Sequence, residues 1–464
     1  MGLCIALRGR HMAAGPATTT ANNSNHTNRS ETEFHPQFGN MTNPAGWYRH
    51  YCLALIFVVL VLNYVDRGIL AVVLEDVKQE FQLNDLQLGL LSGPAFAVFY
   101  ALMGIPFARW ADMGNRRVVI SFSLAVWSAM TALGGLAQNF LTLFLTRVGV
   151  GVGEAGAVPP THSLASNYYP PEHHGKTASV LSFSVFVGSF LGLAGGGAIL
   201  AATDWRTTLM AVGLPGVVVA LIAFLTLKEP RQITKVPTPA EILNAESRAI
   251  IRGVLAKKTY LQLLISFAIV SFFSYGIASF AVPFFIRSFG VEIDIIGATY
   301  GGTAAASSVV GTLAAAFLVD RLARRDIRWM LRLPGYACLL AVPFVVASIL
   351  SPSYQICLLF FFIGNTFVSM AIPALFASIY GIIHNNQRSM AIAVFGLAAN
   401  LLGLGLGPVL IGAISDAITP TFGVEALRYT LAGSVLFLAW AAAHILIGSR
   451  SIQQDYVGNE TAPS

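Results

Sequence analysis

Long apolar stretches separated by short polar loops run through most of the sequence. Twelve of them reach about the 20 residues that an α-helix needs to cross a bilayer. Their even number predicts that both chain ends lie on the same side of a membrane. The predicted membrane-spanning helices cover residues 51–74, 86–108, 117–137, 139–163, 176–201, 207–227, 260–286, 293–318, 329–350, 354–380, 389–413 and 425–447.

Polar segments divide these spans into two groups of six. Residues 1–50 are rich in Asn, Thr and Gly, which predicts a disordered cytoplasmic tail. Residues 228–259 separate the groups, and their stretch AEILNAESRAIIRGVL predicts a short amphipathic helix at the membrane surface. The predicted domains are therefore a six-helix bundle over 51–227, this cytoplasmic linker, a second six-helix bundle over 260–448, and a cytoplasmic tail over 449–464.

The composition excludes a soluble protein. The 464 residues are 55% hydrophobic and 11% charged, whereas soluble domains carry about 25% charged residues. A net charge of +6 is spread over short loops and forms no basic domain, so nucleic acid is not an expected partner. The four cysteines show no metal-binding spacing and are expected to be free thiols. The fold class expected is an all-α membrane protein, whose main partner is the lipid bilayer.

Basic residues predict the orientation of the chain. The side that holds both termini carries 22 Lys and Arg residues and the opposite side carries 4. Since cytoplasmic loops are enriched in Lys and Arg, both termini are predicted to be cytoplasmic. The short loops and the absence of a signal peptide favour a bacterial inner (plasma) membrane.

Two charged residues near the middle of the first span predict a functional site. The 15 Leu, Ile, Val and Phe residues of 52–74 contribute roughly −4.5 to −9 kcal/mol to insertion. Asp66 and Arg67 each cost roughly 2.5 to 3.5 kcal/mol, which nearly cancels that gain. Ionisable residues inside a membrane normally face a bundle interior or a wet cavity and serve a site. The alternative is an Asp–Arg pair that only locks two helices together.

The fourth span carries a second pair of charges. Arg147 and Glu154 lie seven residues apart, so they project from nearly the same helix face. Gly149 and Gly153 form a small-xxx-small pair that lets a neighbouring helix approach closely. No strand precedes these glycines, which argues against a nucleotide-binding loop and against ATP as the energy source.

The two groups of spans repeat a loop pattern. Asp112 lies 60 residues after Cys52, and Asp320 lies 60 residues after Tyr260. Each aspartate follows the second span of its group and precedes a basic cluster, Asp112-Met-Gly-Asn-Arg116-Arg117 in one case and Asp320-Arg321-Leu-Ala-Arg324-Arg325 in the other. Internal repeats of this kind are typical of transporters that bind their substrate between two halves near the midplane.

These features resemble the major facilitator superfamily over about residues 51–448. Asn63-Tyr64-Val65-Asp66-Arg67 is similar to a motif that organic-anion symporters share with the Spinster group of lipid transporters. The pattern from Arg147 to Ala155 is similar to the Spinster R-x-x-x-G-x-G-E-A motif, and Asn115 agrees with that group. Ala108 and Met113 depart from the superfamily's loop motif.

The resemblance implies two pseudo-symmetric six-helix bundles that work by alternating access. It also implies a glycine-rich fifth span that pivots, with Gly188, Gly192 and Gly196 as helix-packing residues. The residues that it implies as cytoplasmic gating loops are Asp112, Arg116, Arg117, Asp320, Arg321 and Arg324.

Away from their ends, the last six spans contain no Lys, Arg, Asp or Glu. Their candidate cavity residues are neutral: Tyr275, Asn365, Ser369 and Asn400. A cavity that is charged on one side and apolar on the other suits an amphiphile with a lysolipid-like or anionic character. Its head group is expected at a substrate and proton site made of Asn63, Tyr64, Asp66, Arg67, Arg147 and Glu154.

The coupling ion is expected to be a proton, with no other cofactor, no catalytic residue and no metal. An anionic head group that takes an arginine would free its carboxylate to bind a proton, which is the logic of symport. A ligand ammonium at Asp66 or Glu154 would compete with the proton, which is the logic of antiport, and both schemes stay open.

Three other functions would account for part of the pattern. A proton-coupled symporter of small organic anions such as sugar acids is the first. A membrane enzyme would need a cluster of acid–base residues, and only the His162–His174 region offers any. A receptor would have no need of the paired loops. The chain is expected to be a transporter that acts as a monomer.

Overall fold

The computed structural model describes residues 46–230, 245–384 and 387–457, all within one unit that begins at Asn43. The described residues form helices and no strand. Within this described part of the chain, eleven helical stretches are long and apolar enough to cross a membrane, and the last of them, Met390–Asp455, has 66 residues. At Gly423 the backbone φ is 56° and the chain turns, so this stretch holds the last two predicted spans. The predicted all-α membrane fold is confirmed.

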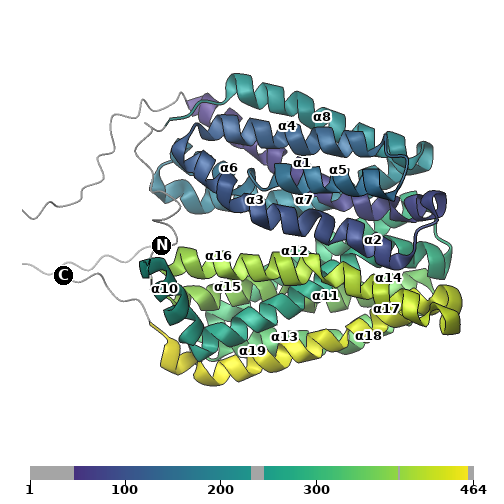
Figure 1. Cartoon of the computed structure of the whole chain (residues 1–464). Coiled ribbons are helices and arrows are strands. Elements are labelled where there is room, and N and C mark those ends of the chain that lie inside the picture. Colours follow the sequence, from purple (N-terminus) through teal and green to yellow (C-terminus); the bar gives the residue numbers. More distant parts are fainter. Residues whose placement is uncertain (1–45, 231–244, 385–386, 458–464) are drawn as a thin grey trace, which may run out of the picture. The chain divides into compact units, whose positions relative to one another are not determined.

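Most spans of the first half are single helices, and two are interrupted (Figure 1). The second span breaks at Gly93 and the fourth at Ala155–Ala157. The helices are α1 (Gly46–Phe81), α2 (Asp85–Ser92), α3 (Pro94–Met113), α4 (Arg116–Gly134), α5 (Phe140–Glu154), α6 (Val158–Tyr168), α7 (His174–Ala202) and α8 (Trp205–Thr226).

The second half begins with the linker helix α10 (Ala245–Ala256), where the sequence predicts an amphipathic helix. Its Val254 is buried against Tyr260 and Leu263, so α10 packs on the second half. The other helices are α11 (Lys258–Phe289), α12 (Ile293–Ala323), α13 (Trp329–Ile349), α14 (Tyr354–Ser369), α15 (Ala371–Ile382), α16 (Arg388–Ala398), the π-helix η3 (Ala399–Gly405), α17 (Gly407–Phe422), α18 (Ala426–Ser434) and α19 (Leu436–Asp455).

Polar caps explain where several helices begin. The side chains of Asn84 and Asn139 each accept a hydrogen bond from a backbone N–H of the first turn, in a capping box. Asp204 does the same for α8 by accepting from the N–H groups of Arg206 and Thr207. The hydrogen bonds from Thr207 and Arg206 lower the pKa of Asp204.

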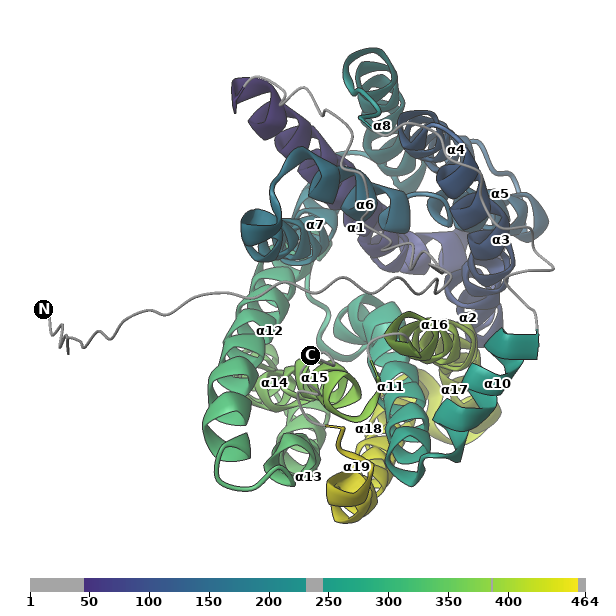
Figure 2. The ribbon, with the colours of Figure 1, turned by 90° about the vertical axis from the view of Figure 1, so that its left-hand side faces the viewer.

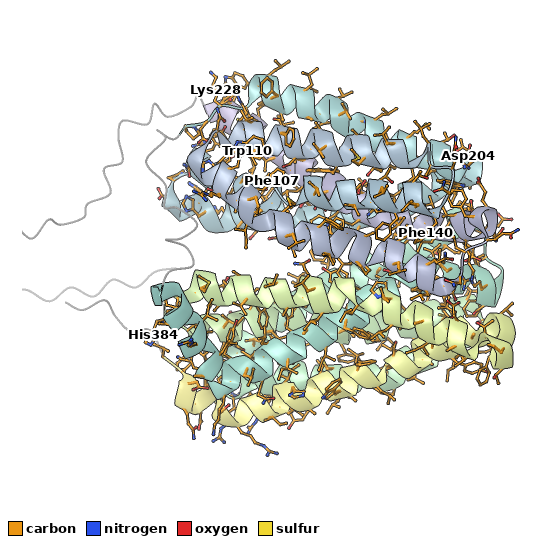
Figure 3. The ribbon with its side chains drawn as sticks, in the orientation of Figure 1. Phe107, Trp110, Phe140, Asp204, Lys228 and His384 are labelled. Atoms are coloured by element: carbon orange, nitrogen blue, oxygen red, sulfur yellow. The ribbon has the colours of Figure 1, made fainter. Side chains whose placement is uncertain are left out.

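The helices define two ends of this unit (Figure 3). Lys228 and His384 lie at one end, which we call the tail end, and Asp204 and Phe140 lie at the other, which we call the far end. The two halves meet along α2 with α17 and α7 with α12, and both pairs lie side by side in Figure 2.

At the far end the backbones of the two halves touch. A Cβ atom added to Gly412 of α17 would lie 2.1 Å from the carbonyl oxygen of Asp85. One added to Gly89 of α2 would lie 2.4 Å from the carbonyl oxygen of Pro408. Glycine at these positions therefore allows α2 and α17 to pack without side chains between them.

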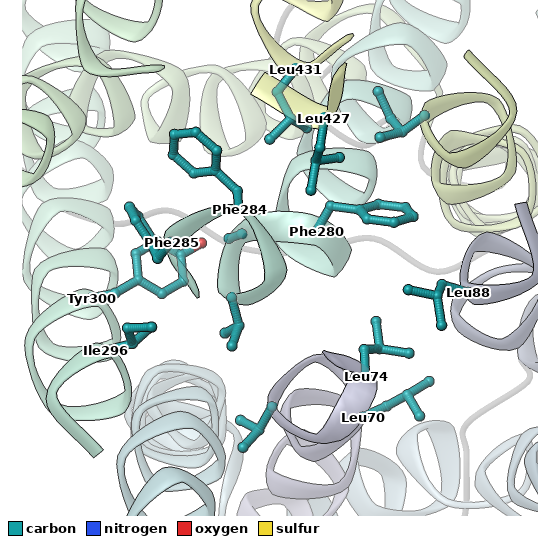
Figure 4. Close-up of a cluster of buried hydrophobic side chains, with 14 of the residues drawn as sticks. Leu70, Leu74, Leu88, Phe280, Phe284, Phe285, Ile296, Tyr300, Leu427 and Leu431 are labelled. Carbon is teal, nitrogen blue, oxygen red and sulfur yellow. The ribbon is translucent and has the colours of Figure 1, made fainter. Parts of the chain in front are cut away.

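Buried apolar side chains from both halves pack in one cluster near this interface (Figure 4). Leu70 and Leu74 come from α1, Leu88 from α2, and Phe280 and Phe284 from α11. This cluster joins the halves and, through Leu70 and Phe284, also borders the cavity described next.

Candidate functional site

A cavity of about 470 Å³ lies between the two halves. Its walls come from α1, α2, α3, α5 and α7 of the first half and from α11, α12, α13, α14, η3 and α18 of the second. Phenylalanine, tyrosine, alanine and aliphatic side chains make up most of the lining. Among the described residues, Arg67 and Arg147 are its only charged lining side chains.

Asp66 is held inside the first half by two neighbouring helices. Its side chain accepts a hydrogen bond from the hydroxyl of Thr131 on α4. Its Oδ2 atom lies 3.4 Å from Nη1 of Arg147 on α5. Asp66 is 3% exposed and Arg147 is 5% exposed, so this is a buried ion pair.

Arg67 forms the second ion pair, with Glu154 of α5. Its Nε donates to Oε2 of Glu154 over 2.8 Å, and the glutamate side chain is fully buried. The guanidinium also lies 5.0 to 5.6 Å from the ring centres of Tyr64, Phe96 and Tyr100. The structure thus brings together the four charged residues that the sequence predicts as a site.

The two arginines and the two carboxylates of this site lie at different depths from the cavity. Both arginines line it, whereas Asp66 and Glu154 do not. The carboxylates therefore lie behind the arginines, within the first half. An anion in the cavity can reach a guanidinium directly, whereas a cation meets the arginines before it meets a carboxylate.

Several buried polar atoms of this site have no hydrogen-bond partner among the described residues. They are Oε1 of Glu154, Nε of Arg147, and both side-chain polar atoms of Asn63, which is fully buried. Such atoms are rare in native interiors because each costs free energy when unpaired. The site therefore has free capacity to bind a proton or a polar group.

The other predicted cavity residues differ in position. Tyr64, Tyr275 and Asn365 line the cavity. Asn63 does not, because it faces the interior of the first half. Ser369 and Asn400 do not line it, and the amide of Asn400 donates to the carbonyl of Gly396 on the preceding helix α16.

In the first predicted gating loop, the arginines bind within their own half. Arg116 is buried, donates to Ser163 over 2.8 Å, and forms an ion pair with Glu229 just after α8. Arg117 donates to the carbonyl of Leu227 over 3.3 Å. The side chain of Asp112 lies outside the described residues.

In the second predicted loop, Asp320, Arg321 and Arg324 are exposed. None of the three forms an ion pair with another described side chain. The described contacts of both loops thus include no bond between the two halves.

The predicted packing glycines lie at close helix contacts. On α7, Cβ atoms added to Gly188, Gly192 and Gly196 would lie 2.6, 2.8 and 2.4 Å from atoms of α1. On α5, an added Cβ would lie 2.6 Å from a side-chain atom of Met130 at Gly149, and 2.6 Å from the backbone nitrogen of Trp127 at Gly153.

Gly153→Ala is expected to destabilise the protein by about 1 to 3 kcal/mol, because a backbone atom cannot move aside as a flexible side chain can. Gly195→Ala on α7 is the control, since nothing lies within 4 Å of its added Cβ. Alanine there is expected to be neutral or to stabilise the helix by up to about 1 kcal/mol. Thermal unfolding in one detergent compares the two variants, and equal midpoints would contradict the close packing of α5 on α4.

Charged residues also connect the two halves at the far end. Arg287 of α11 donates to Glu75 of α1 and to Asp85 of α2, each over 2.9 Å. The carboxylate of Asp416 on α17 accepts from the backbone N–H groups of Asp85 and the next residue, over 2.9 and 2.8 Å. We call Arg287, Glu75, Asp85 and Asp416 the far-end latch. These bonds join the two halves at the far end.

Sequence reasoning missed three features of this site. Thr131 carries no charge, so nothing in its span singled it out as the partner of Asp66. Ser308, a cavity residue on α12, is one serine among many. In the sequence Arg287 is one of the 4 basic residues predicted on the side opposite the termini, and its partners are more than 200 positions away.

The sequence matches a family model and several known proteins. Residues 56–408 match the model of the Major Facilitator Superfamily. An "MFS-type efflux pump" of Mycolicibacterium smegmatis is 31% identical over 398 residues, which cover 85% of this chain and 90% of the relative. Human "protein spinster homolog 1" is 28% identical over 405 residues, covering 82% of this chain and 76% of the relative.

Solved structures agree with these matches. A bacterial homolog of the human lysosomal transporter Spinster, in an inward-facing and unoccupied conformation, has a TM-score of 0.80 and 32% identity. The match covers 89% of this chain and 99% of that one. The nucleoside transporter NupG, at 11% identity and a TM-score of 0.68, shares the fold.

Proposed function

The chain belongs to the major facilitator superfamily and is a Spinster-like, multi-pass membrane transporter, and we propose that it carries amphiphilic, lysolipid-like molecules with an acidic head group. Transport is coupled to protons and proceeds by alternating access. The protein acts in a bacterial plasma membrane with both termini in the cytoplasm. The predominance of Lys and Arg on the terminal side supports that orientation.

One observation carries the choice of substrate. Among the described residues, the cavity offers two arginines and no carboxylate, against a lining that is mostly apolar and aromatic. The arginines suit a phosphate or carboxylate head group, which a guanidinium can bind with two hydrogen bonds. The apolar walls from α11 to α14 suit an acyl chain.

The order of the charges supports symport over antiport. An acidic head group reaches Arg67 or Arg147 without displacing a carboxylate from the cavity wall. When it takes the arginine, Glu154 or Asp66 loses its partner inside the first half. A buried carboxylate without a partner is costly as an anion, so it binds a proton. The acidic substrate and the proton then bind together.

Ligand-induced stabilisation of the purified protein tests this function. The protein in nanodiscs would be heated at two pH values with a lysophospholipid, a sphingoid phosphate, a hexuronate or a cationic dye. We expect the lysophospholipid and the sphingoid phosphate to raise the unfolding midpoint, since a ligand at 100 times its Kd adds about 2.7 kcal/mol to the stability. Arg67→Ala and Arg147→Ala are expected to lose this shift.

Arg206→Ala is the matched control, because Arg206 pairs with Glu80 at the far end and does not line the cavity. It should keep the full lipid shift. Stabilisation by hexuronate alone would overturn the lipid proposal in favour of a symporter of small organic anions. Stabilisation by the dye alone would contradict an acidic substrate.

A further inference from the structure

A group of neutral polar side chains lies at the cavity on the second half, whose part of the described lining contains no charged residue. The amide nitrogen of Asn365 on α14 donates to Ser307 over 2.8 Å and to Ser308 over 3.1 Å, both on α12. Ser369, one turn beyond Asn365, donates to Ser308 over 3.3 Å. We call Ser308, Asn365 and Ser369 the serine–asparagine node.

The hydrogen atoms of this node can be assigned. The hydroxyl of Ser307 donates to the backbone carbonyl of Thr303 over 2.7 Å, so it must accept from Asn365. This fixes the amide with its nitrogen toward α12 and both of its N–H groups in use. The carbonyl oxygen of Asn365 then has no donor among the described residues. Ser308 accepts two hydrogen bonds, and its own hydroxyl hydrogen has no described acceptor.

The two unused groups belong to residues that line the cavity. Ser308 and Asn365 are both part of its wall, and Ser369 supports them from behind. Their neighbours in the wall are apolar: Ala304, Ala305, Phe361 and Val368. An apolar wall with one spare donor and one spare acceptor favours a ligand that supplies the matching pair.

Close helix packing holds the node in place. A Cβ atom added to Gly311 of α12 would lie 2.3 Å from the carbonyl oxygen of Thr366 and 2.9 Å from Cβ of Ser369. Glycine therefore lets α12 and α14 approach closely enough for the serine and asparagine side chains to bond. The node is held by both helices and is not a chance meeting of long side chains.

We propose that the serine–asparagine node binds a hydroxyl group of the transported molecule. A hydroxyl oxygen both donates and accepts, so one atom can satisfy Asn365 and Ser308 together. The N–H and C=O groups of a secondary amide point in opposite directions and cannot do so. This inference rests on the proposed function and narrows it: the substrate is an acidic amphiphile that also carries a hydroxyl, bound on the half opposite the arginines.

A thermodynamic cycle tests this proposal. It removes the hydroxyl from the ligand in one step and a side chain of the node from the protein in the other. The probes are 1-oleoylglycerol 3-phosphate, which has a free hydroxyl at C2, and oleoylpropanediol phosphate, which lacks it. Their Kd values are measured in nanodiscs for the wild type, Ser308→Ala and Asn365→Leu. Wild-type protein should bind the hydroxylated lipid roughly tenfold more tightly or better, because the analogue leaves polar groups unpaired. In both variants this ratio should fall toward 1.

Ser274→Ala is the control, since Ser274 also lines the cavity but belongs to α11 and lies outside the node. It should keep the wild-type ratio. Ser308→Ala removes only one oxygen atom, so it tests the node even where Asn365→Leu fails to fold. Equal binding of the two lipids by the wild type would overturn the node proposal and leave the proposed function intact. Wild-type protein that binds neither lipid would overturn both.

Discussion

Replacing Arg287 with glutamine is expected to shift the protein strongly toward conformations with an open far end. Arg287 bridges Glu75 and Asp85, and all three side chains are mostly buried. Removing one partner of a buried ion pair costs about 3 to 5 kcal/mol. Without Arg287, Glu75 loses its partner, whereas Asp85 keeps its ion pair with Lys78 at 2.6 Å, so the loss should lie near the lower end of that range. The latch joins the two halves, so we expect the loss to fall on the arrangement in which the far end is closed. The ratio of open to closed molecules should rise on the order of 100-fold or more, at about tenfold per 1.4 kcal/mol.

Spin labels at Ala202 and Val424 would measure this shift. Both residues are exposed at the far end, one on each half. Double electron–electron resonance should show a longer distance between the two labels in Arg287→Gln than in the wild type. Arg428→Gln is the matched control, because Arg428 pairs with Glu425 and binds the carbonyl of Ser288, all within the second half. An unchanged distance distribution in Arg287→Gln would show that the latch does not hold the far end closed.

The second large effect is expected from Asp66→Asn, which should abolish the pH dependence of transport while ligand binding stays measurable. An amide cannot take up the proton that the carboxylate takes up. Arg147 is buried beside Asp66 and would lose its counter-charge, so the stability of the protein should also fall. The arginines that line the cavity remain, so the acidic head group still finds its site.

Lipid uptake into proteoliposomes with and without a pH gradient measures this effect. The control is Thr131→Val, which removes only the hydroxyl that donates to Asp66 and leaves the carboxylate in place. It should retain the pH response. Full pH dependence in Asp66→Asn would refute the assignment. If Glu154→Gln loses the pH response and Asp66→Asn keeps it, the proton-binding residue is Glu154, whose Oε1 has no partner among the described residues.

The sequence predicted the spans well because a helix that crosses a bilayer needs a long apolar run. It predicted their ends less well. α1 runs from Gly46 to Phe81, well beyond the apolar residues 51–74, because polar residues continue the helix outside the hydrophobic layer. The break at Gly93 has a local cause, because Pro94 follows it and a proline disfavours the helical conformation at the preceding residue. The predicted span over 86–108 ran through this position. The π-helix η3 contains no proline and had no clear signal.

The site was predictable to the extent that its residues are costly in a membrane. Four charged residues could be recognised because a charge inside a membrane span costs free energy and is usually kept for a function. They are Asp66, Arg67, Arg147 and Glu154. Their pairing did not follow from the sequence: Arg67 binds Glu154 and not the nearer Asp66, because Asp66 is held by α4 and α5. Neutral residues such as Ser308 cost little in a span, so only the structure distinguishes them from other serines.

The backbone contact at the far end also bears on energy conservation. Gly412 packs so closely on the carbonyl of Asp85 that a single methyl group would collide there, so no file of water molecules can pass between these segments. A protein in a charged membrane must prevent ions from leaking across it, and each charge that crosses dissipates roughly 2.3 kcal/mol per 100 mV. We therefore expect the α2–α17 contact at Gly89 and Gly412 to exclude water and ions on this side of the interface, which would limit the loss of an ion gradient through the protein.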